Sequence, residues 1–112
     1  MKYAAALMFL LLALACGREE ERPADLLDRS SFKAVLVEAQ LIEARVNREM
    51  TVDKRQDIPV KQYYAEMFAQ KDIPAEAFHR TFNWYAEHPE ELKAVYADVL
   101  TELQQRSDTI PH

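Results

Sequence analysis

Glycine and cysteine are nearly missing from this 112-residue sequence, which contains one of each, Gly17 and Cys16. Phosphate-cradling loops need backbone conformations that only glycine adopts cheaply, so a single glycine excludes most such loops and disfavours a turn-rich β-sandwich. One cysteine excludes an intramolecular disulfide, a four-cysteine zinc site and a Cys-x-x-Cys redox pair. The abundant residues are helix formers: Ala, Leu, Glu, Gln, Arg and Lys.

Runs of basic residues are also absent, and the formal net charge is −5. Removal of a leader containing Lys2 would make the charge −6, that is −5 − 1. An acidic chain without a basic patch is a poor ligand for nucleic acid and for anionic lipid surfaces. We therefore expect no nucleic-acid partner, and a basic partner or simple solubility fits the charge better.

Motifs for metal binding and catalysis are missing as well. None of His79, His88 and His112 has a histidine four residues away or a cysteine nearby, so no metal site is expected. Neither Gly-x-Ser-x-Gly nor His-Glu-x-x-His occurs, and no pair of acids stands out from the polar surface. The sequence predicts a protein that is not an enzyme and needs no cofactor.

The amino terminus has the pattern of a bacterial lipoprotein signal. Lys2 precedes an apolar run at residues 4–14, which has the length of a signal-peptide core and is too short to span a bilayer. The sequence ALAC at 13–16 resembles a lipobox, although a residue larger than alanine is usual at its first position. We predict a signal peptide at 1–15 and lipidation of Cys16, giving an outer-membrane lipoprotein. The alternative is a secreted protein with an incidental cysteine.

Residues 16–29 are predicted to be the lipidated cysteine and a charged tether, because the stretch GREEERP at 17–23 is polar and ends in proline. Residues 16–20 also resemble the surface-export signal of Bacteroidota lipoproteins: cysteine, any residue, a basic residue and two acids. A plain hydrophilic spacer explains them equally well. Whether the domain faces the periplasm or the cell surface therefore stays open.

Four amphipathic helices are predicted within residues 30–106, with a flexible tail at 107–112. They are expected at 31–50, 59–71, 74–88 and 89–106. Apolar residues recur at helical spacing, and no window alternates with the period of a strand. The stripe of the first helix is Phe32, Val35, Leu36, Ala39, Ile42, Val46 and Met50. The predicted fold is all-α, a small bundle or orthogonal array of about four helices.

Helix starts are predicted from capping residues. Ser30 or Ser31 is the expected N-cap of the first helix. Pro59 and Pro74 are expected as first residues of the second and third helices, with Asp57 as a cap for the second.

Glu43 falls inside the apolar stripe of the first helix when residues are projected at about 100° each. A buried carboxylate needs a partner, and the candidates are Tyr64, Tyr85 and Arg80. We interpret Glu43 as a tie between helices. A buried acid at a ligand site is the alternative, and a slightly rotated stripe would leave Glu43 at its edge.

Eight of the eleven aromatic residues lie between Tyr63 and Tyr96, and most are interpreted as core. A groove for a peptide or an apolar ligand is the alternative. Trp84 lies at the margin of its stripe, where it could cap the core or anchor a partner. With its neighbours His79 and Arg80 it forms the candidate partner-binding surface.

Several segments together resemble a domain-of-unknown-function family of short Bacteroidota lipoproteins. They are LIEA at 41–44, FHRTFNWY at 78–85 and PEEL at 89–92 with Tyr96 further on. Thr81 stands where the family pattern has serine. The resemblance covers roughly residues 30–104 and implies a helical lipoprotein domain, but it carries no activity or catalytic residue.

The function predicted from these features is a non-enzymatic, membrane-anchored module that binds an envelope protein or peptide. A periplasmic chaperone-like accessory factor is one alternative. Another is an envelope small-ligand binder or enzyme that uses Glu43 with nearby tyrosines.

Overall fold

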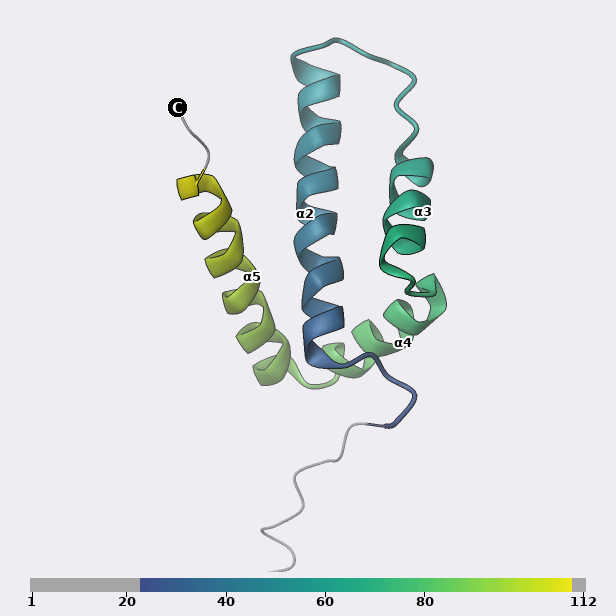
Figure 1. Cartoon of the computed structure of the whole chain (residues 1–112), viewed down its shortest axis with the longest axis vertical. Helices are drawn as coiled ribbons and strands as arrows, with labels where there is room; N and C mark the ends of the chain where they lie inside the picture. The colour runs from purple at the N-terminus through teal and green to yellow at the C-terminus, as the bar shows by residue number, and fades with distance from the viewer. Residues whose placement is uncertain (1–22, 110–112) are drawn as a thin grey trace, which may run out of the picture.

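The computed structural model describes residues 23–109, which form four α-helices and no strand (Figure 1). The helices are α2 (Arg29–Thr51), α3 (Val60–Lys71), α4 (Ala75–Ala86) and α5 (Pro89–Thr109). The all-α prediction is therefore confirmed. The predicted signal peptide and Cys16 lie outside the described residues, as does His112.

The longest helix, α2, is the centre of the arrangement. Figure 1 shows α3 and α5 on opposite sides of α2, with α4 crossing near its amino-terminal end. α2 contacts each of the other three helices, and α4 also contacts α5. The chain thus runs along α2, back along α3, across α4 and out along α5, so that α2 and α5 are parallel.

Helix α2 begins earlier than predicted. The side chain of Asp28 accepts a hydrogen bond of 2.8 Å from the backbone N–H of Ser31, so Asp28 is the N-cap. The prediction of Ser30 or Ser31 as the cap is wrong, because both residues already lie in the first helical turn. The aspartate satisfies a backbone N–H that would otherwise lack a helical partner.

Other predicted boundaries change as well, among them the end of α4, which stops at Ala86 and not at residue 88. Pro59 and Pro74 are N-cap residues placed one position before their helices, and no side chain caps α3, so the Asp57 cap is wrong. Helix α5 does begin at Pro89, as predicted, but it continues to Thr109. Residues 107–109 therefore belong to the helix and not to a tail.

The segment before α2 is packed against the domain, so the predicted tether is too long. Leu26 and Leu27 are half-buried, and Leu27 packs against the core. The backbone N–H of Leu27 donates to the hydroxyl of Thr81 at 3.0 Å. That hydroxyl donates in turn to the carbonyl of Ala77, so the fully buried Thr81 joins the incoming chain to α4.

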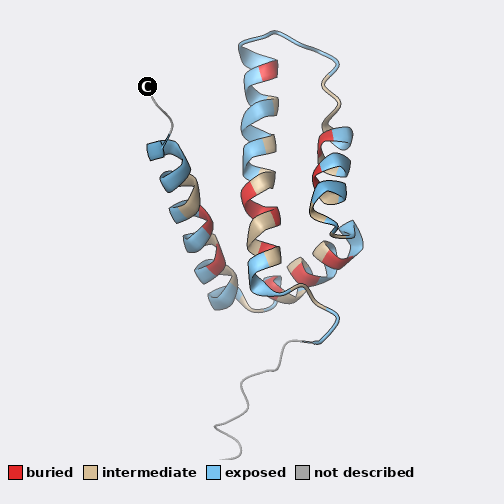
Figure 2. Cartoon of the chain, in the orientation of Figure 1, coloured by how far each residue is buried: buried red, intermediate tan, exposed pale blue. Residues whose placement is uncertain are grey.

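The core lies where α2, α4 and α5 meet, as the buried residues in Figure 2 show. Its fully buried side chains include Phe32 and Val37 of α2, Tyr85 of α4, and Val95 and Val99 of α5. Phe78, Phe82, Trp84 and Tyr96 pack against this cluster. The interpretation of Phe78, Phe82 and Tyr96 as core is confirmed, and Trp84, whose role the sequence left open, also packs against the core.

The carboxyl-terminal half of α2 buries fewer side chains than the apolar stripe predicted from the sequence implies. Arg106, in the last turns of α5, pairs with Glu38, so α5 ends beside the middle of α2. Beyond that point α3 is the helix that packs on α2. Met50 is 57% exposed and its place in the stripe is wrong, whereas Glu49 beside it is buried.

No helix in the described part of the chain combines the length and the apolar character needed to span a membrane.

Candidate functional site

A groove between α2 and α3 is the candidate site within residues 23–109. Its volume is about 370 Å³, at the lower end of the range of about 300–1,000 Å³ that ligand pockets occupy. Its lining residues come from facing sides of the two helices: Glu38, Ile42, Arg45, Tyr63, Glu66, Met67, Gln70 and Lys71. Ile42 and Met67 are its apolar lining residues, and the lining also includes two acids and two bases.

Glu49, 4% exposed, is a buried acid near Arg45 and Tyr63 of the groove. The Nε of Arg45 donates to its carboxylate at 2.8 Å and the Nη1 of Arg55 at 3.1 Å. The hydroxyl of Tyr63 lies 2.8 and 3.0 Å from its two oxygens. The guanidinium of Arg45 also lies 3.9 Å from the centre of the Tyr63 ring, a cation–π contact.

These contacts keep Glu49 ionised although it is buried. Burial alone would raise the pKa of its carboxyl group, but hydrogen bonds from Arg45 and Tyr63 and the nearby positive charges outweigh burial and lower the pKa. A carboxylate with three donors around it is poorly suited to accept a proton from a substrate. We therefore interpret this cluster as the support that holds the end of the groove.

The loop after α2 is fixed by the same residue. The backbone N–H of Arg55 donates to the carbonyl of Glu49 at 2.9 Å, while the Arg55 side chain pairs with the Glu49 carboxylate. Lys54 takes a left-handed conformation with φ of 57°, which lets the chain fold back. Sequence reasoning missed Glu49. The sequence feature that could have predicted its burial is its spacing of seven residues from Ile42, which places both side chains on the same face of the helix.

Glu43, the acid that the sequence placed in the stripe, is exposed, so that prediction is wrong. The stripe of α2 that α3 covers is rotated toward Ile42 and Glu49, which leaves Glu43 at the edge. The hydroxyl of Tyr64 donates to the Glu43 carboxylate, so the expected tie between helices is confirmed. Burial and this hydrogen bond raise the pKa of Tyr64 to about 12.

The other two partners proposed for Glu43 are used elsewhere. Arg80 pairs with Asp25 at 3.7 Å. Tyr85 is buried, as expected, but its ring stacks on Phe32 in the core.

The predicted surface of Trp84, His79 and Arg80 is only partly assembled. Trp84 is half-buried, packs against the core and stacks on His88 with 3.9 Å between ring centroids. Arg80 is exposed one helical turn away, on the same side of α4. His79 is exposed and five residues from Trp84, a spacing that places it on another side of the helix. Partner binding by these residues stays a prediction.

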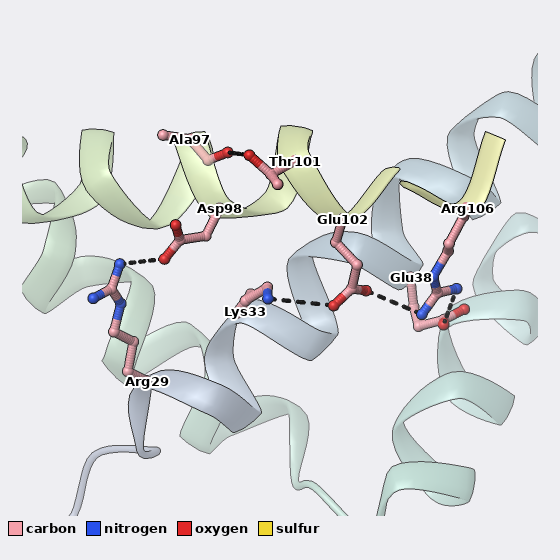
Figure 3. Close-up of polar contacts among 8 residues, drawn as sticks. All are labelled: Arg29, Lys33, Glu38, Ala97, Asp98, Thr101, Glu102 and Arg106. Atoms are coloured by element: carbon pink, nitrogen blue, oxygen red, sulfur yellow. Dashed lines mark hydrogen bonds and ion pairs between the residues drawn. The ribbon is translucent and has the colours of Figure 1, made fainter. Parts of the chain in front are cut away.

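Ion pairs join α2 to α5 along their parallel course (Figure 3). Arg29 pairs with Asp98, Lys33 with Glu102, and Glu38 with Arg106. In the first two pairs the base lies on α2 and the acid on α5, whereas in the third pair the acid lies on α2. A shift of α5 by one turn toward the amino-terminal end of α2 would bring Arg106 toward Lys33, so the charge order favours the observed register. Figure 3 also shows Thr101 donating to the carbonyl of Ala97 within α5.

Within residues 23–109, no three side chains of His, Cys, Asp or Glu gather as a metal ion would require.

The described part of the chain matches a known protein family. Residues 23–109 match the family described as Domain of unknown function (DUF4296). The match covers 87 residues (109 − 23 + 1) of 112 and begins at the segment that packs against α4. Neither the curated proteins nor the solved structures give a match.

Proposed function

The chain belongs to the DUF4296 family, and from that premise we propose that it is a non-enzymatic outer-membrane lipoprotein whose helical domain binds an envelope protein or peptide. The lipobox-like sequence before Cys16 supports the anchor. The groove between α2 and α3 supports the binding role and is the observation on which it rests.

The groove suits a segment that presents an apolar side chain next to a carboxylate. The half-buried Ile42 and the buried Met67 supply apolar atoms to its lining, which an apolar side chain of the partner would contact. Two charged side chains of the groove already have partners within the domain, because Glu38 pairs with Arg106 and Arg45 with Glu49.

Lys71 supplies the positive charge for this carboxylate. Among the described residues it has no ion pair within 4.0 Å, and it lies at the end of α3 beside the groove. An acidic group on the partner could pair with Lys71 at little desolvation cost, since Lys71 is only half-buried.

A matched pair of charge reversals tests the binding role. Lipidated protein is crosslinked in its own envelope and purified, with Lys71→Glu compared against Lys93→Glu, an exposed lysine on α5. We expect Lys71→Glu to lose most of a partner that Lys93→Glu retains. Equal recovery with both variants would overturn the groove as the binding surface. Loss with Trp84→Ala instead would assign binding to the α4 surface.

The alternative functions have less support. A small-ligand binder or enzyme built on Glu43 would need an acid withdrawn from solvent, and Glu43 is exposed. No feature of residues 23–109 specifically favours a chaperone-like role. The periplasmic or surface orientation is decided by protease treatment of intact cells, since digestion of the domain before lysis excludes the periplasm.

A further inference from the structure

The chain enters the domain at one end of α2. Residues 23–28 lie beside α4, at the end opposite the α2–α3 loop (Figure 1). Three contacts hold this segment: the hydrogen bond from Leu27 to Thr81, the packing of Leu27 on the core, and the Arg80–Asp25 ion pair. The direction in which the chain reaches the domain is therefore set by α4.

The distances involved separate the two ends of the domain. Cys16 and Pro23 are seven residues apart (23 − 16), which span at most about 25 Å when fully extended. The 23 residues of α2 extend about 35 Å at about 1.5 Å each. A lipid on Cys16 thus keeps the α4 end within reach of the bilayer, while the α2–α3 loop can extend farther away.

The surfaces of the two ends also differ. Within residues 23–109 the exposed large apolar side chains are Leu41, Met50, Val52 and Leu100. Three of these lie on the far half of α2 or directly after it, and none lies on α4 or in residues 23–28. An end without exposed large apolar groups has little to insert into lipid.

Charge gives the α4 end no attraction of its own to an anionic lipid surface. The α4 end carries more exposed acids, among them Asp25, Glu87, Glu90 and Glu91, than exposed bases, which are Arg29, Arg80 and Lys93. Anionic headgroups would repel these carboxylates, so the lipid anchor and the short tether alone hold this end near the bilayer.

We propose that the domain stands on the bilayer with α4 toward the lipid, and that it presents the α2–α3 loop and the adjoining groove away from the membrane. This orientation rests on the lipid anchor at Cys16 proposed above. It places the exposed Met50 and Val52 where a protein partner can reach them.

Energy transfer from tryptophan tests the orientation, because Trp84 is the only tryptophan and lies on α4. Full-length lipidated protein is placed in phosphatidylcholine vesicles that contain a dansyl-labelled phosphatidylethanolamine. A Trp84→Phe, Val52→Trp variant moves the donor to the opposite end, at a site that is 70% exposed. We expect several-fold weaker transfer from position 52. Equal or stronger transfer from position 52 would overturn the proposal.

A second pair leaves Trp84 intact in case its replacement disturbs folding. Asn83→Cys and Asp53→Cys place a fluorescent thiol label on exposed positions of α4 and of the α2–α3 loop, while Cys16 is blocked by its lipid. Nitroxide-labelled lipid should quench the label at 83 more than the label at 53. The reverse order would contradict the proposed orientation.

Vesicle flotation separates the two proposals. If the native chain fails to float with the vesicles, or if Cys16→Ser floats equally well, the anchor is wrong and the orientation proposal falls with it. If the native chain floats through Cys16 but both positions report equal distances, the anchor stands and only the orientation is wrong.

Discussion

The aromatic rings of Phe32 and Tyr85 lie parallel, 4.4 Å apart between centroids and inclined by 6°. This stack joins the first turn of α2 to the end of α4. Both side chains are almost completely buried, at 0% and 2% exposure. Phe78 and Phe82 contact Phe32 from the same helix as Tyr85, at 5.6 and 6.4 Å between centroids. Phe32 is thus the residue through which α2 is seated on α4.

Replacing Phe32 with alanine should therefore be among the most destabilising single changes. Removal of a buried phenylalanine typically costs about 3–5 kcal/mol, from lost burial and from the cavity that remains. Denaturant unfolding followed by circular dichroism measures this loss. Leu100→Ala is the control, because Leu100 is 67% exposed and its loss should cost less than about 0.5 kcal/mol. Similar losses for the two variants would contradict the assigned core.

Thr81 gives a prediction about the hydroxyl that links the incoming chain to α4. Thr81→Val keeps the shape but leaves the N–H of Leu27 without its acceptor, which should cost about 1–3 kcal/mol. Thr81→Ser keeps the hydroxyl and should restore much of this loss, apart from the missing methyl group. Hydrogen exchange at the Leu27 amide should speed up in Thr81→Val and much less in Thr81→Ser. Equal exchange in both variants would exclude the bond as the cause.

The sequence predicted the four helices because each has apolar residues at helical spacing and a proline or polar residue near its start. It could not predict how each stripe is rotated. Met50 and Glu49 are adjacent, and their predicted and observed burial are exchanged. A rotation of about 100° separates neighbouring residues, so the choice depends on which helix covers the far half of α2.

The Glu49 cluster is a second feature that spacing along the sequence could not predict in full. Its four side chains come from α2, from the loop at Arg55 and from α3 at Tyr63. Only Arg45, four residues away on the same helix, could be paired with Glu49 from sequence spacing. The other two partners meet it because the loop turns back at Lys54 and α3 lies antiparallel to α2. The Tyr64–Glu43 tie was predicted in part, since Tyr64 was one of three candidate partners named for Glu43 from the sequence.

The lowered pKa of Glu49 predicts the acid sensitivity of the protein. Since the carboxyl pKa is lower in the folded state than its ordinary value of 4.5, the stabilisation is present above about pH 4.5 and is lost as the pH falls through the folded-state pKa. Glu49→Gln should melt at a lower temperature at pH 7, because Arg45 and Arg55 lose their counter-charge. The difference between native protein and variant should shrink below about pH 4.5.

Melting curves between pH 3 and 7 measure this difference directly. Glu91→Gln serves as the control, since Glu91 is an exposed acid on α5. Its melting temperature should differ little from that of the native protein at any pH in this range. A Glu49→Gln difference that stays constant across the range would show that the carboxylate charge is not its source.

The third ion pair between α2 and α5 predicts a charge-swap result. Arg106→Glu would place an acid beside Glu38 and Glu102, and it should destabilise the domain by about 0.5–1 kcal/mol at low salt. Glu38→Arg alone would face Arg106 with a like charge. The double variant restores opposite charges between the helices, so it should recover part of the loss. The recovered energy, measured as a double-mutant cycle, should fall as salt is added because the pair is partly exposed. Additive losses in the double variant would mean that Glu38 and Arg106 do not interact in solution, and this pair would then play no part in holding α5 beside α2.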